Sequence, residues 1–211
     1  MTTRQDTARR LWPQAGSAAM AAMGVALLTG AARAEPAVDR FRTGNTVSCL
    51  FEGFSVDPDP AGLPVRTEPR TDAPSYNRLP PPRVVGVDEI AVVVRVVGFR
   101  DGWFRIDSAW FPGESKPGGG AASAPAYRGD GWVPVPTIKA TLAGKSLRTA
   151  PRADAPVRAS LSGRRGGFPL TPDGVAVRRL LGCRGAWVEV DTEFGIGWVD
   201  RVCGRQLEPC S

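Results

Sequence analysis

Four cysteines carry the most definite chemistry in this chain: Cys49, Cys183, Cys203 and Cys210. A cysteine acts as a nucleophile beside a histidine, ligates a metal, or pairs in a disulfide. The chain has no histidine, which removes the Cys–His pair and most zinc ligand sets. An even number of cysteines therefore indicates two disulfides. Three pairings are possible, and the sequence leaves the choice between them open.

Carboxylates are the remaining catalytic candidates, because two of them can hydrolyse a glycosidic bond without histidine. That chemistry needs a cleft with a fixed carboxyl separation, which small β-modules rarely build. Asp107, Asp191 and Glu189 are better explained as strand-end and outward-facing residues. We therefore expect a protein that is not an enzyme and that holds no metal or cofactor.

Residues 1–34 have the pattern of a signal peptide. Arg9 and Arg10 precede the short apolar run GSAAMAAMGVALLTGAA, and small residues at Ala32 and Ala34 suit a signal peptidase. The alternative is an uncleaved N-terminal anchor, although the run is short for a membrane span. The pattern predicts a periplasmic or secreted protein with no stable membrane insertion after cleavage. An oxidising compartment agrees with the expected disulfides.

The net charge argues against nucleic-acid binding. The full chain carries a formal charge of +6, and loss of residues 1–34 removes four arginines and one aspartate, which leaves +3. The remaining positive residues alternate with acids, as in RTEPRTDAP, and form no basic block.

One passage of the chain occurs twice. AGLPVRTEPRTDAP, at residues 61–74, agrees with AGKSLRTAPRADAP, at 143–156, in nine of fourteen positions without a gap. Similarity at a fixed offset indicates a duplicated structural unit. Pro69 and Pro151 are expected to fix a bend in each copy, and Asp72 and Asp154 to accept hydrogen bonds from backbone amides of the turn.

The repeat continues downstream as strands. VVVRVVGFRDGWFRID, at 92–107, and VAVRRLLGCRGAWVEVD, at 175–191, have the β-branched content and tight-turn residues of hairpins. Each copy then ends in a Gly-Trp-Val strand, GDGWVP and GIGWVD. We expect Trp103 with Trp132, and Trp187 with Trp198, to fill two small cores. No window after the leader has sustained helical periodicity, so the fold class is all-β.

The first copy carries 18 extra residues between its two tryptophans, in SAWFPGESKPGGGAASAPAYR. Its Gly, Pro, Ala and Ser content predicts a mobile loop. Trp110, Phe111 and Tyr127 lie at its ends. They either pin the loop to its own domain or form a recognition surface.

Each copy reads as an R-T-x-P-R-x-D-A-P opening, a hairpin with a Trp at its turn, and a closing G-x-G-W-V. This pattern resembles the bacterial SH3-like domain, although Pro64 and Ser146 stand where that family has an opening Asn. The resemblance implies two tandem small, partly open barrels after the signal peptide. They follow a flexible lead-in at 35–47. The first copy spans 48–138 and contains the long insertion, and the second copy spans 139–211.

In exported proteins this family attaches to cell-wall peptides or mediates protein contacts. The resemblance therefore implies a binding module for peptidoglycan peptides or for an extended segment of an envelope protein. The alternative is a structural, protein-interaction component of a periplasmic complex with no wall ligand. The candidate ligand-binding residues are Arg66, Arg148, Trp103, Trp187, Trp110 and Tyr127. Arg66 and Arg148 have a second interpretation, as exposed side chains whose stems cover apolar surface.

Overall fold

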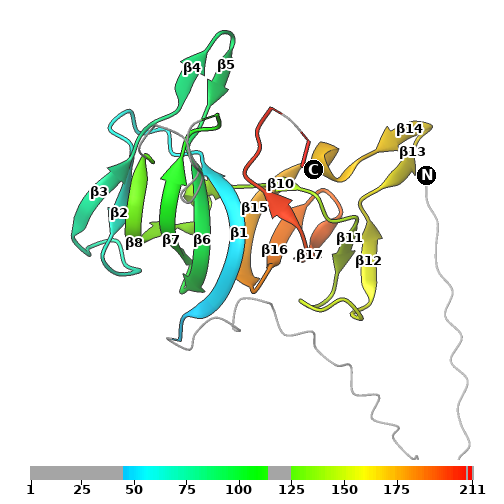
Figure 1. Ribbon diagram of the computed structural model, residues 1–211. Coiled ribbons are helices and arrows are strands. Elements are labelled where there is room, and N and C mark those ends of the chain that lie inside the picture. Colours follow the sequence, from blue (N-terminus) through cyan, green and yellow to red (C-terminus); the bar gives the residue numbers. More distant parts are fainter. Residues whose placement is uncertain (1–44, 114–124, 208, 211) are drawn as a thin grey trace, which may run out of the picture. The chain divides into compact units, whose positions relative to one another are not determined.

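The chain is all-β in a computed structural model that describes residues 45–113, 125–207 and 209–210 (Figure 1). Within these ranges the helical elements are short 3₁₀ turns, and none is long and apolar enough to cross a membrane. The predicted signal peptide at 1–34 and the lead-in up to residue 44 lie outside the described residues, as does the insertion from 114 to 124.

The strands follow the two copies seen in the sequence. In the first copy they are β1 (Val47–Ser55), β2 (Leu63–Arg66), β3 (Ser75–Leu79), β4 (Arg83–Val85), β5 (Asp88–Ile90), β6 (Val93–Arg100), β7 (Trp103–Trp110), β8 (Tyr127–Pro134) and, after η2 (Val135–Thr137), β9 (Ile138–Lys139). In the second they are β10 (Thr141–Leu142), β11 (Ser146–Arg148), β12 (Val157–Ser160), β13 (Gly163–Arg165), β14 (Phe168–Leu170), β15 (Val177–Arg184), β16 (Trp187–Thr192), β17 (Gly195–Val199) and β18 (Val202–Cys203), with η3 (Pro172–Gly174) before β15.

The two copies have the same strand order. The first sheet runs β3-β2-β8-β7-β6-β1-β9 and the second β12-β11-β17-β16-β15, so five strands of one correspond one to one with five of the other. Each copy also has a separate two-stranded ribbon, β4-β5 and β13-β14. The duplication read from the sequence is thus a duplication of sheet topology.

The predicted hairpins are present. β6 and β7 pair antiparallel around Asp101 and Gly102, whose φ angles are 50° and 81°. Two central residues with positive φ suit the right-handed twist of a two-residue hairpin, and Asp-Gly adopts them at low cost. In the second copy β15 and β16 pair in the same way around Gly185, whose φ is 57°.

Strand β1 joins the two copies. It pairs antiparallel with β6, and the register shifts between Ser48 and Phe51. At this bulge the Leu50 amide donates to the Gly185 carbonyl at 2.7 Å, and the Gly185 amide donates to the Ser48 carbonyl at 2.8 Å. A disulfide between Cys49 and Cys183 lies beside these bonds. β1 also contacts β15, so it lies against strands of both sheets. The second copy's own short β10 pairs with β18 and lies outside the five-stranded sheet.

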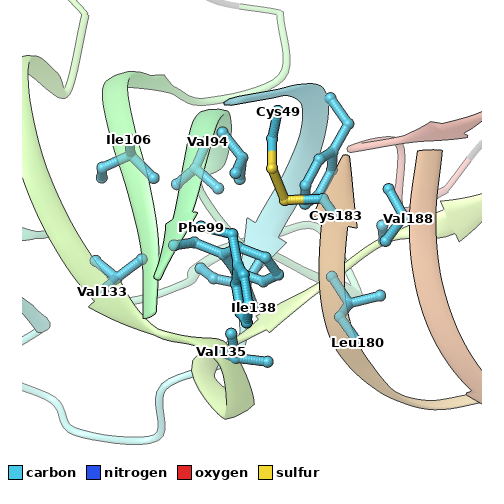
Figure 2. Close-up of a cluster of buried hydrophobic side chains, with 14 of the residues drawn as sticks. Cys49, Val94, Phe99, Ile106, Val133, Val135, Ile138, Leu180, Cys183 and Val188 are labelled. Carbon is cyan, nitrogen blue, oxygen red and sulfur yellow. A yellow bond between two sulfur atoms is a disulfide. The ribbon is translucent and has the colours of Figure 1, made fainter. Parts of the chain in front are cut away.

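The hydrophobic core is continuous across the copies, which differs from the expectation of two small separate cores. Figure 2 shows Val94 and Phe99 of the first copy on one side of the disulfide, and Leu180 and Val188 of the second on the other. All four are buried members of one cluster. The described residues accordingly form one compact unit.

The tryptophans lie on the other side of their sheets from this cluster. Phe104 and Val133 are register partners within the cluster, whereas Arg105 pairs with Trp132 one position further along. Because neighbouring residues of a strand point to opposite faces, Trp132 points away from the cluster. Trp198 is placed in the same way beside the clustered Val199. Both rings are buried, at 8% and 9% exposure, but they do not fill the common core.

Replacing Cys49 and Cys183 together by Ser is expected to lower the free energy of unfolding by about 5 kcal/mol, against about 2 kcal/mol for the Cys203 and Cys210 pair. The reason is loop length: the first disulfide spans 134 residues and the second spans 7. Urea denaturation of the oxidised proteins, followed by tryptophan fluorescence, measures both losses. The wild type should unfold in one transition because its core is shared. Two separate transitions would contradict the shared core.

Candidate binding site

Three hollows lie beside β1 and the residues that follow it, and neighbouring hollows share a lining residue, Glu52 or Gln206. The first, of about 230 Å³, is lined by Leu50, Phe51, Glu52, Arg95 and Val202. The second, of about 450 Å³, is lined by Glu52, Ile90, Val93, Trp110, Pro112, Gly113 and Gly204–Leu207. The third, of about 530 Å³, runs from Phe54 to Pro58 and includes Pro60, Pro81, Pro82, Glu89, Ala91 and Gln206. We call this row the β1 groove.

The floor of the β1 groove is the outer face of β1, β6 and β7. Strand register places Phe54 opposite Val93, and Val93 opposite Trp110. Their side chains therefore share one face, on the side of β1 opposite to the clustered Phe51. Two residues before Phe54, and therefore on the same face of β1, Glu52 lies opposite Arg95. The floor is thus apolar at one point and charged at the next.

The wall of the β1 groove comes from the end of the second copy. The Gln206 side chain accepts a hydrogen bond from the Ala91 amide at 2.8 Å and donates one to the Ala91 carbonyl at 2.9 Å. A Cβ added at Gly204 would lie 2.8 Å from the Gly53 carbonyl oxygen, so only glycine allows this close approach. The Cys203–Cys210 disulfide closes the segment into a loop.

The charges in the β1 groove are of both signs. Arg95 donates two hydrogen bonds of 2.7 Å to Asp107, which raise the pKa of Arg95 above its ordinary value despite partial burial. Glu52 and Arg205 add one charge of each sign to the lining. Among residues 45–113, 125–207 and 209–210 no group of three His, Cys, Asp or Glu side chains could hold a metal. The lining suits binding of a chain with both apolar and charged groups.

Arg66 and Arg148 have equivalent places in the two copies. Arg66 Nη1 donates to the Ala73 carbonyl at 2.7 Å, and Arg148 Nη1 donates to the Ala155 carbonyl at 2.7 Å. Each bond closes the repeated turn passage onto its strand, and both alanines are buried. Each arginine is also the register partner of a tryptophan, Trp132 or Trp198. The structure gives both arginines a role in holding this turn.

The turn itself differs in one detail from the expectation. Asp72 accepts a hydrogen bond from the Arg70 side chain at 2.7 Å, and Asp154 one from Arg152 at 3.1 Å, rather than from backbone amides. The pKa of Arg70 is raised, first by its hydrogen bond to Glu68 and then by the charge of Asp72. Backbone bonds such as Thr67 amide to Pro74 carbonyl, at 3.0 Å, close the turn instead.

The aromatic residues at the ends of the insertion are buried. Trp110 is 6% exposed, Phe111 3% and Tyr127 2%. The Arg83 guanidinium stacks 3.7 Å from the Phe111 ring centre. The Tyr127 hydroxyl lies 3.3 Å from that of Tyr76, and burial raises the pKa of Tyr127 well above its ordinary value. These rings anchor the ends of the insertion to its own copy. Of the three, only Trp110 lines the β1 groove.

Trp103 and Trp187 occupy equivalent positions at the start of β7 and β16. Trp103 is 8% exposed, and Trp187 is partly buried. Each shares a sheet face with its partner tryptophan, Trp132 or Trp198, because the residue two positions on pairs directly with that partner. The strands thus bring together candidate ligand-binding residues within each copy, Arg66 with Trp103 and Arg148 with Trp187. The other two candidates, Trp110 and Tyr127, lie elsewhere.

Sequence reasoning missed the residues that form the wall of the β1 groove. Arg205, Gln206 and Leu207 belong to no repeated motif, since the first copy has no matching segment. The one signal was the close spacing of Cys203 and Cys210, which marked a small closed loop there. No protein family, no curated protein and no solved structure matches the chain.

Replacing Arg148 by Ala is expected to lower the free energy of unfolding by about 1–3 kcal/mol, because the carbonyl of the buried Ala155 loses its hydrogen-bond donor. The control is Arg152→Ala, which removes an exposed ion pair 3.1 Å long and should cost less than about 0.5 kcal/mol. Urea denaturation measures both. Equal losses for the two variants would show that the Ala155 bond does not stabilise the turn.

Proposed function

We propose that this is a non-catalytic binding protein of the cell envelope that holds an extended chain in the β1 groove. The ligand is a peptidoglycan peptide or an extended segment of an envelope protein. The observation that carries the proposal is the alignment of three hollows along one strand. A site for a compact molecule would be a single deep cavity, whereas a row of shallow hollows suits a linear ligand.

The length of the β1 groove sets the size of the ligand. It follows β1 and the residues after it from Leu50 to Asp57. Eight extended residues span about 26 Å, so the groove accommodates an extended peptide of roughly eight residues. Trp110, Val93 and Leu207 offer apolar contacts, and the prolines of the third hollow add a rigid apolar wall.

The chemistry of the lining supports a peptide over a uniformly charged polymer. Glu52 and Arg205 lie in the same hollow, and Arg95 with Asp107 lies next to it. Peptides with free amino and carboxyl groups present both signs of charge, as cell-wall peptides do. The two disulfides support export to an oxidising compartment, where such ligands occur.

A second candidate function is protein interaction with no wall ligand. The β4-β5 ribbon ends in exposed Val84, Val85 and Val87, at 77%, 57% and 98% exposure. Figure 1 shows this ribbon projecting away from the sheet. An apolar tip with this exposure favours contact with a partner protein.

Leu207→Asp and Leu50→Asp are expected to weaken co-sedimentation of the full chain with purified peptidoglycan sacculi at low salt by roughly tenfold each, because each replaces an apolar contact of the β1 groove by a charge. Both side chains are exposed, at 58% and 63%, so the fold should tolerate the changes. Val157→Asp is the matched control, since Val157 is 52% exposed on the second copy.

The wild type should sediment with the sacculi, and Val157→Asp should behave as the wild type does. Absence of binding by the wild type would remove the cell-wall ligand. A photo-crosslinking residue at position 207 then tests the protein-segment ligand in envelope extract, with the same residue at position 157 as control. A protein crosslinked from 207 and not from 157 would support that ligand, and no crosslink from 207 would remove it as well.

A further inference from the structure

Three arginines surround Trp132 on the first copy. Arg66 on β2 and Arg105 on β7 are the register partners of Trp132 on its two sides. The Arg100 guanidinium carbon lies 5.2 Å from the ring centre. Arg100 is itself the register partner of Trp103, on the same face. We call Arg66, Arg100 and Arg105 with Trp132 the arginine face.

The arginine face has more positive than negative charge. Asp130 forms an exposed salt bridge with Arg105, with its carboxylate 3.8 Å from Arg105 Nε and beyond hydrogen-bond distance. That Nε is a buried nitrogen with no hydrogen-bond partner among the residues the structure describes. Buried donors are nearly always satisfied, so this one indicates that an acceptor is missing. Arg66 donates to the neutral Ala73 carbonyl and has no salt bridge among the residues that the structure describes.

The second copy contains the same arrangement with two changes, at the positions of Arg105 and of Asp130, where the second copy has Glu189 and Ile196. Arg148 replaces Arg66 beside Trp198, and Arg184 replaces Arg100 beside Trp187. The position of Arg105 is taken by Glu189, which is the register partner of Trp198 and is 8% exposed. The second copy therefore has a carboxylate of its own beside its tryptophan, where the first copy has a third arginine.

We propose that the arginine face binds an external oxyanion, a carboxylate or a phosphate group, which supplies the charge that Glu189 supplies in the second copy. Planar guanidinium groups bind either group through paired N–H donors. The Arg105 guanidinium provides such donors, because its side chain is 40% exposed. This site is separate from the β1 groove and does not depend on its ligand.

The probes are inorganic phosphate and succinate, titrated into the full oxidised chain at low ionic strength. Nuclear magnetic resonance of the indole N–H groups follows binding, and Trp132→Phe assigns the signal of Trp132. The wild type should show a saturable shift of that signal while the Trp198 signal stays in place. A shift with phosphate alone assigns the site to phosphate esters, and one with succinate alone assigns it to carboxylates. No saturable shift with either anion overturns the proposal.

Arg105→Glu should weaken binding of the effective anion by roughly ten- to a hundredfold, the effect of losing a charge-assisted hydrogen bond. Because Asp130 would lie beside the new carboxylate, Arg105→Gln is the companion variant, which removes the charge without this repulsion and is expected to fold. Arg100→Gln is a milder second variant and should weaken binding several-fold. Arg179→Glu is the control: it changes the net charge equally at a side chain on the second copy that is 63% exposed.

Binding by Arg179→Glu should equal that of the wild type. An equal loss in Arg179→Glu and Arg105→Glu would show general charge attraction and would overturn the site. Neither variant touches the β1 groove, so co-sedimentation with sacculi should be unchanged in both. The proposal of an anion site at the arginine face and the proposal of a linear ligand in the β1 groove can therefore be refuted independently.

Discussion

The fold depends on the bulge in β1 at Cys49 and Leu50. A strand pairs with neighbours on two edges, and the bulge turns the start of β1 so that one edge meets β6 and the other meets the β15–β16 turn at Gly185. The Cys49–Cys183 disulfide fixes this contact covalently. Once β1 is shared, Phe99 and Val188 can belong to one cluster, and each sheet gains a buried face that its own strands alone would not cover.

The β1 groove is a consequence of the shared strand. Because β1 lies between the copies, the end of the second copy passes across it, and Gln206 and Gly204 fix that segment to Ala91 and Gly53. Neither copy alone has both a floor and a wall. Duplication of a small β-unit therefore produced a surface that a single unit does not possess, at the contact between its two copies.

Local pattern predicted the local structure well. The Asp101-Gly102 turn, the paired hairpins and the closing Gly-Trp-Val strands all follow from residue types over short windows. The two-core expectation failed because the pairing of β1 with Gly185 joins residues 135 positions apart, and no short window contains it. The face of the tryptophans was equally ambiguous. In Gly-Trp-Val alternate residues point to opposite faces, so either Trp132 or Val133 points inward, and the pattern does not say which.

The positions that the two copies share are those that hold the fold. Arg66 with Ala73 and Arg148 with Ala155 make the same hydrogen bond at the same length, so this pair is needed wherever the turn is built. Other positions differ between the copies. Glu189 reverses the charge of Arg105, and the two-residue β10 is much shorter than the nine-residue β1, while the order of the five corresponding strands stays the same. The turn and the order of these five strands hold in both copies, so the differences at other positions leave the shared framework intact. These other positions are the ones at which the copies can acquire separate ligands.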